Sequence, residues 1–450
     1  MPSKNTRIFL AAILTMVSGF LSTPTLVYAG SKERVLHSFN DKGGAYPYAP
    51  LTFDAAGNLY GTTSDGGAYG EGCGYGYGCG TAFELIPGTN GKWTEKVLHS
   101  FGRGKDGLDP VSGLIRDGTG NLYGTTTHGG AYNSGCSGIG CGVVFELTPS
   151  IDGRWTEKVL HSFGKGKDGV WPDGGLVMDS AGNVYGTTFS GGSTSSCQPY
   201  CGTVFELTPC RNGTWKERVL HSFDYLDGTG PYGNLIFDAT GNLYGVALGG
   251  YSRSGCSTEG CGIVFQLTPG ANGKWTEKVV HRFGLGTDGF SPSGSLALDM
   301  SGNLYGTTFS GGAYGGGTFF ELARGGNGRW TEKVLHNFGS GSDGVRPTGG
   351  LIFDSTGNIY GTTNEGGVFS QYCPDYYGCG TDFELIPVGN GKWTETILYN
   401  FCSTVDCKDG FYPSAVILDG AGNLYGTTSG GGFPICAGGQ PCGTVFEIER

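Results

Sequence analysis

The sequence lacks the short motifs by which many enzymes are identified. It has no Gly-x-Ser-x-Gly nucleophile turn, no His-Glu-x-x-His metal motif and no phosphate-binding loop. Charged residues are few, at 15%. The sequence has no Gly-X-Y period, which excludes a collagen. Helical periodicity is also absent, which disfavours a helical fold. Aromatic residues, at 13%, supply enough apolar surface for a core, so disorder is disfavoured as well.

Long apolar runs are missing everywhere except near the start of the chain. Lys4 and Arg7 precede an apolar run over residues 8–21, and Val27-Tyr28-Ala29 offers a cleavage site before Gly30. Residues 1–29 are therefore predicted to be a signal peptide, with a retained N-terminal anchor as the alternative. The mature chain is expected to be secreted, periplasmic or at the cell surface, with no transmembrane segment.

The balance of charge bears on the partners of the mature chain. Removing Lys4 and Arg7 with the leader changes the formal net charge from −11 to −13. An acidic surface repels phosphate backbones, so nucleic acid is not an expected partner. We expect a monomer.

Cysteine is plentiful, and in an exported chain this indicates disulfides. Fourteen of the 15 cysteines form close pairs: Cys73/Cys79, Cys136/Cys141, Cys197/Cys201, Cys256/Cys261, Cys373/Cys379, Cys402/Cys407 and Cys436/Cys442. Cys210 is left over. Zinc ligation is the alternative, but each pair lacks a His partner at zinc-ligand spacing, so disulfides are favoured.

One repeat unit occurs seven times and decides the fold class. Asp-x-x-Gly-Asn-x-Tyr-Gly has its asparagines at 58, 121, 183, 242, 303, 358 and 423, which are 55 to 65 residues apart. A Phe-Glu-Leu type strand follows, with its phenylalanines at 83, 145, 205, 265, 320, 383 and 446. Six copies continue into a segment that starts at Trp93, Trp155, Trp215, Trp275, Trp330 or Trp393 and runs to a His-x-Phe ending, as in His99-Ser100-Phe101.

Each unit is predicted to form four antiparallel strands. In the sixth copy these are residues 351–354, 359–363, 381–386 and 393–401, which are rich in β-branched and aromatic residues and separated by Gly-rich turns. Seven such units indicate an all-β, seven-bladed β-propeller over residues 30–450, with a β-solenoid as the alternative. The predicted blades span residues 47–101, 110–163, 172–223, 231–283, 292–338, 347–401, and 413–450 together with 33–39.

The last blade supports this prediction independently. The seventh copy stops at Arg450, after its third strand, while residues 32–39 form a fourth strand with no blade before it. The N-terminal strand is therefore predicted to complete blade seven and close the ring, which removes an exposed edge.

The motifs also carry a family resemblance. The combination Gly-Gly-Leu-Ile-Phe-Asp-x-x-Gly-Asn-x-Tyr-Gly-Thr-Thr, Phe-Glu-Leu and Trp-Thr-Glu-Lys-Val-Leu-His-x-Phe resembles the bacterial GloVer (Gloeo/Verruco) tandem repeat of exported proteins with varied C-terminal anchors. The likeness covers essentially all of the mature chain. It implies a surface or extracytoplasmic location and no particular activity. The chain ends at Arg450 without a hydrophobic tail, so no C-terminal anchor is expected.

Propeller topology predicts which face binds. The second-to-third and fourth-to-first connections share one face, vary in length and carry the cysteine pairs, and variable loops on a rigid scaffold are where binding sites usually lie. We call this the cysteine-bearing face, and expect the disulfides to stiffen its loops. Its non-repeat aromatics are candidate ligand contacts, with burial against their own loops as the alternative. The candidates are Trp171, Tyr69, Tyr132, Tyr200, Tyr251, Tyr376 and Tyr377.

Repeated ionisable residues are expected to be structural. One histidine per blade, in six blades, belongs to a fourth strand, and the repeated glutamates are too regular for an acid/base pair. His128 is the exception, a loop residue. A repeated aspartate lies in the fourth-to-first loops, where an Asx-type turn is favoured and a calcium-binding ring is the alternative. These aspartates are Asp106, Asp168, Asp227, Asp288, Asp343 and Asp409. No cofactor is expected.

The predicted fold and the residues of its cysteine-bearing face suggest two functions. The leading hypothesis is a binding or surface-scaffold propeller that recognises an extracellular glycan or protein through its cysteine-bearing face. The alternative is an enzyme acting on an extracellular polysaccharide at the channel mouth, since propellers host both. Its site would use residues that break the repeat, such as Asp109, Trp171, Asp173, Arg253 or Arg346.

Overall fold

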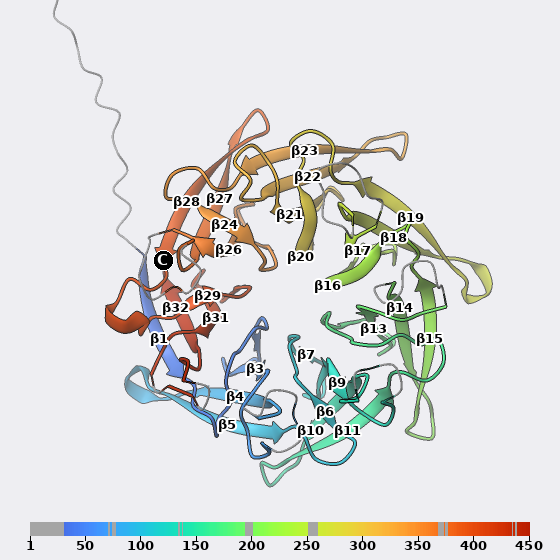
Figure 1. The fold of residues 1–450 in the computed structure, drawn as a ribbon, viewed down its shortest axis with the longest axis vertical. Coiled ribbons are helices and arrows are strands. Elements are labelled where there is room, and N and C mark those ends of the chain that lie inside the picture. Colours follow the sequence, from blue (N-terminus) through green and yellow to red (C-terminus); the bar gives the residue numbers. More distant parts are fainter. Residues whose placement is uncertain are drawn as a thin grey trace, which may run out of the picture.

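The protein is described by a computed structural model that covers residues 31–70, 73, 78–133, 136, 138–193, 201–250, 260–367, 373, 377–433, 435–436 and 439–450. Seven antiparallel sheets stand around a central axis, which confirms the predicted all-β seven-bladed propeller (Figure 1). Helix in the described residues is limited to the short 3-10 turns η1 (Thr89–Gly91), η2 (Ala271–Gly273) and η3 (Val405–Cys407). None of the described helices is long and apolar enough to cross a bilayer.

The strands of each blade follow one another from the axis to the rim. Blade one holds β2 (Thr52–Phe53), β3 (Leu59–Thr63), β4 (Thr81–Pro87) and β5 (Trp93–Ser100). Blade two holds β7 (Ile115–Arg116), β8 (Leu122–Thr126), β10 (Val143–Pro149) and β11 (Trp155–Ser162), and a small ladder of β6 (Gly107–Leu108) and β9 (His128–Gly129) precedes and extends it. Blade three holds β12 (Val177–Met178), β13 (Val184–Thr188), β14 (Thr203–Pro209) and β15 (Trp215–Ser222).

The remaining blades repeat this order. Blade four holds β16 (Thr229–Phe237), β17 (Leu243–Gly249), β18 (Ile263–Pro269) and β19 (Trp275–Arg282). Blade five holds β20 (Phe290–Leu298), β21 (Leu304–Ser310), β22 (Thr318–Arg324) and β23 (Trp330–Asn337). Blade six holds β24 (Gly344–Pro347), β25 (Ile352–Phe353), β26 (Ile359–Gly366), β27 (Thr381–Gly389) and β28 (Lys392–Asn400). Blade seven holds β29 (Phe411–Pro413), β30 (Ile417–Leu418), β31 (Leu424–Gly430), β32 (Thr444–Glu449) and β1 (Lys32–Ser38).

Blade seven joins the two ends of the described chain, as predicted. β1 pairs antiparallel with β32, so that Lys32 lies opposite Glu449 and Ser38 opposite Thr444. Figure 1 shows blue β1 beside red β32. The pairing gives β32 a partner on its outer side and so covers a hydrogen-bonding edge.

The hydrophobic core lies between neighbouring blades. The phenylalanine that follows each fourth strand packs, edge-on or tilted, against the Phe-Glu-Leu phenylalanine of the next blade. Phe101 and Phe145, with ring centroids 4.9 Å apart, are one of seven such pairs around the ring. The others are Phe39/Phe83, Phe163/Phe205, Phe223/Phe265, Phe283/Phe320, Phe338/Phe383 and Phe401/Phe446. These buried rings explain why the phenylalanines recur in every copy.

The glycine of each Tyr-Gly pair makes room for this core. A Cβ atom on Gly61 would lie 2.6 Å from Cζ of Phe83 and 2.9 Å from Cδ2 of Leu51. The same conflict arises at the equivalent glycines of the other blades. Any larger side chain here would push the ring out of the sheet interior.

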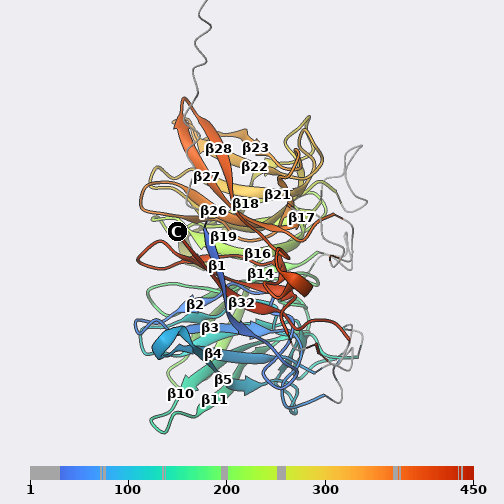
Figure 2. The same cartoon turned by 90° about the vertical axis from the view of Figure 1, so that its left-hand side faces the viewer.

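The Asp-x-x-Gly-Asn turns close the face opposite the cysteines. Asp54 Oδ1 accepts hydrogen bonds from the backbone N–H groups of Ala56 and Asn58, and its Oδ2 accepts one from the Tyr60 hydroxyl. Tyr60 also donates to Glu84. Figure 2 views the ring edge-on, with strands running between its two faces. The short turns therefore leave the longer connections together on the other face.

Candidate ligand site at the mouth of the central channel

A proline recurs in or shortly before the inner part of each blade on the cysteine-bearing face, and the residue before it has a positive φ in all seven blades. Six of these residues are not glycine, so the backbone is held in a conformation that side chains disfavour. The residues and their φ values are Tyr46 (55°), Asp109 (57°), Trp171 (59°), Gly230 (58°), Ser291 (54°), Arg346 (58°) and Tyr412 (56°).

The loops of the preceding blades hold this backbone in place. Trp171 N–H donates to the carbonyl of Cys141 over 3.0 Å, and Asp109 N–H donates to the carbonyl of Cys79 over 3.1 Å. Equivalent bonds reach Cys442, Cys201, Cys261 and Cys379, while in blade five Gly316 supplies the carbonyl for Arg346. The second cysteine of each pair in a second-to-third loop thus positions the residue at the mouth of the next blade.

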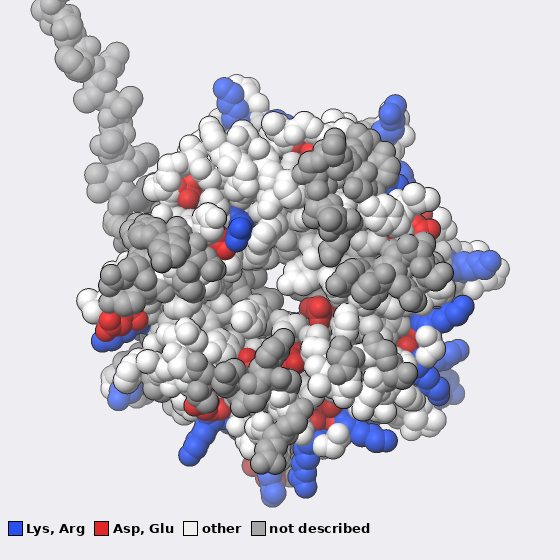
Figure 3. Space-filling view, in the orientation of Figure 1, with Lys and Arg blue, Asp and Glu red and all other residues white. Residues whose placement is uncertain are grey.

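The residues that follow the prolines surround a cavity on the axis. Its volume is about 520 Å³, and all seven blades contribute to its wall. Tyr48 and Tyr232 lie in the wall with half or somewhat less of their surface exposed. Asp173, Asn234 and Asn364 supply polar groups, and no Lys or Arg lies among the described residues that line the cavity. Viewed along the axis, acidic side chains lie beside the central opening (Figure 3).

Three carboxylates, Asp65, Asp109 and Asp173, lie near one another where blades one, two and three meet. Asp109 Oδ2 lies 2.8 Å from Nδ1 of His128, and Thr127 Oγ1 donates to Asp173 Oδ1 over 2.7 Å. Burial raises the pKa of Asp173 to about 6, with Asp109 adding to the rise. Burial likewise raises the pKa of Asp65 to about 6, again with a contribution from Asp109. These carboxylates therefore occupy different environments.

Trp171 and Arg346 flank the mouth without lining the cavity. The Trp171 ring lies 6.4 Å from that of His128, and its Nε1 is buried without a hydrogen-bond partner in the described part of the chain. Arg346 forms an ion pair with Glu365 over 2.5 Å. Its guanidinium also lies 5.3 Å from the ring of Tyr377.

The other predicted aromatic contacts are dispersed. Tyr377 is 63% exposed and lies against Arg346, so it borders the mouth. Tyr69 and Tyr132 instead pack beside their own disulfides, around Gly102 and Gly164. Tyr200, Tyr251, Tyr376 and Arg253 lie outside the described residues.

Tyr48, Tyr232 and Tyr412 are wall residues that were not among the predicted contacts. The signal was present, because the residues on both sides of the seven repeated prolines vary in an otherwise regular unit. Tyr48 follows Pro47 and Tyr232 follows Pro231, as Asp173 follows Pro172. A constant proline between variable neighbours is therefore the pattern that identifies the mouth.

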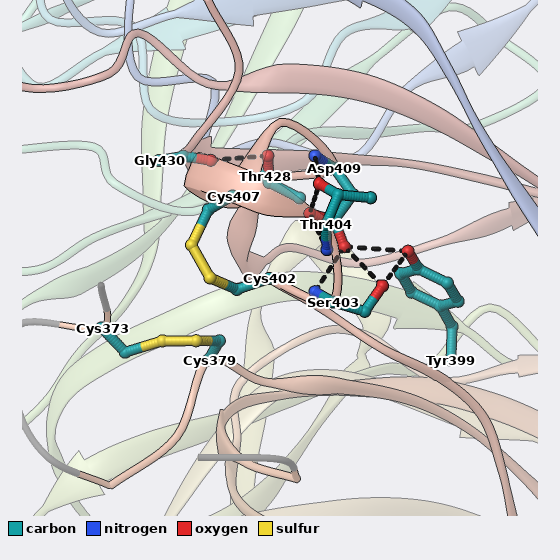
Figure 4. The surroundings of a disulfide bond; sticks show 10 residues. All are labelled: Cys373, Cys379, Tyr399, Cys402, Ser403, Thr404, Cys407, Asp409, Thr428 and Gly430. Carbon is teal, nitrogen blue, oxygen red and sulfur yellow. Dashed lines mark hydrogen bonds between the residues drawn. A yellow bond between two sulfur atoms is a disulfide. The ribbon is translucent and has the colours of Figure 1, made fainter. Parts of the chain in front are cut away.

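Five predicted disulfides join described residues: Cys73–Cys79, Cys136–Cys141, Cys373–Cys379, Cys402–Cys407 and Cys436–Cys442. Cys210 is a free cysteine, while Cys197 and Cys256 lie outside the described residues. Two disulfides from different loops converge in blade six (Figure 4). The sulfurs of Cys373, Cys379 and Cys402 lie within 4.8 Å of one another. Sequence spacing could not reveal this convergence.

The repeated loop aspartates contact the rim of their own blade. Five of them lie 3.0–3.4 Å from the fourth-strand histidine: Asp106 with His99, Asp168 with His161, Asp227 with His221, Asp288 with His281 and Asp343 with His336. In blade six the histidine is replaced by Tyr399, which donates to Asp409 over 2.8 Å. Backbone amides of earlier residues donate to several of these carboxylates, as Gly102 does to Asp106 and Gly164 to Asp168, whereas the Asx-type turn that we favoured would use the amide two residues after the aspartate.

Comparison with known proteins extends these observations. No curated protein matches the chain. Among solved structures, the extracellular domain of a one-component system, BT4673, from B. thetaiotaomicron has a TM-score of 0.51 at 10% identity, covering 93% of this chain and 40% of that one. A luciferin-regenerating enzyme has a TM-score of 0.42 at 12% identity, covering 94% and 96%. The likeness to this extracellular domain shows the fold alone.

The sequence itself identifies the family. The profile described as the Gloeobacter/Verrucomicrobia repeat matches residues 73–256 and 248–450. These two matches together span residues 73–450, which is most of the propeller and includes the C-terminal part of blade seven. The chain belongs to the Gloeobacter/Verrucomicrobia repeat family.

Proposed function

We propose that this protein is an extracytoplasmic propeller that binds a glycan at the mouth of its central channel. The observation that carries the proposal is the cavity of about 520 Å³, whose wall combines tyrosine rings with the side chains of Asp173, Asn234 and Asn364. This volume is in the range of small-ligand sites. Aromatic rings can stack on the apolar faces of sugars, and carboxylates and amides can bond their hydroxyls.

The negative charge of the site indicates which glycans could bind there. The described wall offers a carboxylate and no basic side chain. Asp65 and Asp109 add negative charge nearby, and Arg346 is already paired with Glu365. A polyanionic glycan would be repelled here. The expected ligand is therefore a neutral or cationic sugar chain.

The extracytoplasmic location is supported by other features of the chain. Disulfides persist in oxidising compartments, and five join described residues of this chain. A leader over residues 1–29 fits the same compartment. We infer a secreted, periplasmic or cell-surface protein.

Binding can be tested with the mature protein on a glycan array that includes neutral, cationic and uronate-containing chains. Replacing Tyr48 and Tyr232 by Ala should abolish a hit on neutral or cationic glycans. Tyr314→Ala is the matched control, because Tyr314 is 62% exposed on the same face but is not part of the cavity wall. A hit that depends on Tyr314 and not on Tyr48 or Tyr232 would place binding on the loops instead.

A second function is favoured by one specific observation. Asp109 lies against the His128 imidazole, whereas burial raises the pKa of Asp173 to about 6, so these two nearby carboxylates occupy different environments. Acid/base hydrolysis of a glycan needs such a difference. Release of reducing ends from a bound glycan, lost in Asp173→Asn with binding retained, would establish catalysis.

A further inference from the structure

The rim of the propeller carries a cluster that recurs at the junctions between neighbouring blades from blade one to blade six. It combines the fourth-strand histidine and loop aspartate of one blade with the Trp-Thr-Glu glutamate of the following blade. Between blades five and six these residues are His336 on β23, Asp343 in the connecting loop and Glu395 on β28. Between blades three and four they are His221, Asp227 and Glu277.

The donor atoms of these two clusters converge. In each cluster, one ligand atom from each residue lies within 4.8 Å of the other two. His336 Nε2 is 3.1 Å from Asp343 Oδ2 and 3.7 Å from Glu395 Oε2. Ligand atoms bound at about 2.1 Å to one tetrahedral zinc ion are about 3.4 Å apart. The spacing therefore suits a shared ion.

The carboxylates of the cluster have no described Lys or Arg partner. Asp343 and Glu395 side chains are only 6% and 11% exposed. Asp343 Oδ1 and Glu395 Oε1 are buried and accept no hydrogen bond from a described N–H or O–H group, so these two carboxyl groups can satisfy each other only by sharing a proton. No described Lys or Arg forms an ion pair with either residue. Buried carboxylate oxygens without a donor are costly, so a cation between them would be stabilising.

Access to the cluster is open. His336 is 21% exposed and lies at the outer side of the interface. One imidazole and two carboxylates are ligands suited to Zn²⁺ and similar divalent transition metals, and two carboxylates balance the charge of such an ion.

We propose that His336, Asp343 and Glu395 bind a divalent transition-metal ion of the Zn²⁺ class between blades five and six, and that His221, Asp227 and Glu277 bind a second between blades three and four. Each ion links the fourth strands of two blades, and so fastens the ring at its rim.

One junction of the ring lacks the histidine and so suggests a suitable substitution for the test. At the junction of blades six and seven, Tyr399 stands where His336 stands in blade five, and it bonds Asp409 directly (Figure 4). A tyrosine at this position is thus compatible with the fold. His336→Tyr and His221→Tyr each reproduce the arrangement at that junction while removing the nitrogen ligand.

The experiment uses untagged, oxidised mature protein carrying Cys210→Ser, which removes the free thiol. After chelation and dialysis, ZnCl₂ is titrated by calorimetry. We expect two sites per chain, one in His336→Tyr, one in Glu395→Gln and none in the double variant His221→Tyr/His336→Tyr. X-ray absorption should show nitrogen and oxygen ligands only, and Zn²⁺ should raise the melting temperature of the parent but not of the double variant.

His128→Ala is the control, because His128 pairs with Asp109 at the channel mouth and should leave both sites intact. The proposal is overturned if the parent binds no Zn²⁺ below millimolar concentration, in which case the clusters hold protons only. It is equally overturned if both tyrosine variants keep two sites, or if His128→Ala removes one.

Discussion

Val35 on β1 lies opposite Phe446 on β32, so the first and last strands of the described chain share one ladder. Deleting residues 31–39 would leave β32 with an open edge and remove Phe39 from its contact with Phe83. We expect loss of cooperative unfolding and concentration-dependent aggregation. Thermal circular dichroism and light scattering test this. An unchanged melting transition in the truncated protein would contradict the closure of the ring.

Asp382 is a fully buried carboxylate with no side-chain hydrogen-bond partner in the described part of the chain, and the Phe383 backbone N–H and the Arg450 charge do not offset its burial. Four other blades place valine at this register, namely Val144, Val204, Val264 and Val445. Asp382→Val should therefore stabilise the protein, by roughly 1–3 kcal/mol. Urea unfolding measures this. The reverse substitution, Val204→Asp, should destabilise by a comparable amount.

The gain from Asp382→Val should also grow with pH. Burial holds the pKa of Asp382 well above its usual value of 3.8. The folded chain therefore keeps this proton more tightly than the unfolded chain, and wild-type stability falls as pH rises above about 4. The difference between variant and wild type should be larger at pH 8 than at pH 5. A difference that shrinks with pH would show that the carboxylate is compensated.

Asp238 tests the Asp-x-x-Gly-Asn turn in blade four, where Gln266 replaces the repeated glutamate. Partial burial pushes the pKa of Asp238 up, but hydrogen bonds from Asn242 and Thr240 outweigh it and lower the pKa to about 2. The stability that this carboxylate contributes is present above about pH 4 and is lost as pH falls towards 2. Asp238→Ala should cost on the order of 1–3 kcal/mol at neutral pH and much less at pH 2. Denaturant melts at both pH values would reveal a pH-independent cost if the turn did not depend on the charge.

Asp173 should make glycan binding pH-dependent, if the proposed function holds. Burial raises its pKa to about 6, so the carboxylate that accepts sugar hydroxyls is present above that pH and protonated below it. Affinity should fall by roughly tenfold or more between pH 7 and pH 5. Asp173→Asn should bind more weakly at pH 7 and show a flat profile, which calorimetry can measure. A wild-type profile without a step near pH 6 would remove Asp173 from the ligand contacts.

Cys407→Ser should cause disulfide exchange in blade six. The freed Cys402 thiolate lies within 4.8 Å of the sulfurs of Cys373 and Cys379. Its attack on one of them forms a new bond and releases the other as a thiolate, so no external oxidant is required. Peptide mapping should find Cys402 bonded to Cys373 or Cys379. Cys141→Ser is the control, and Cys136 should then remain a free thiol.

The propeller itself could be derived from the residues, because it is encoded locally and seven times over. Each copy carries the Phe that fills a blade interface, the Gly that admits it and the Asp that closes a turn. An unmatched strand at residues 32–39 and a missing one after Arg450 were enough to predict the closure, since only one arrangement satisfies both. The disulfides that join described residues could also be predicted, because the two cysteines of each pair lie close together in the sequence.

The candidate site and the rim clusters could not be derived in this way, because they depend on contacts between blades. Tyr48 and Tyr232 are far apart in the chain and become neighbours in one wall only when seven inner strands surround an axis. Cys402 meets Cys379, and His336 meets Glu395, across loops and blades whose separation no repeat period encodes. Local pattern determined the strands and their number. Only the tertiary structure determined which side chains of different blades lie together, because the closed ring brings variable residues of separate copies into contact.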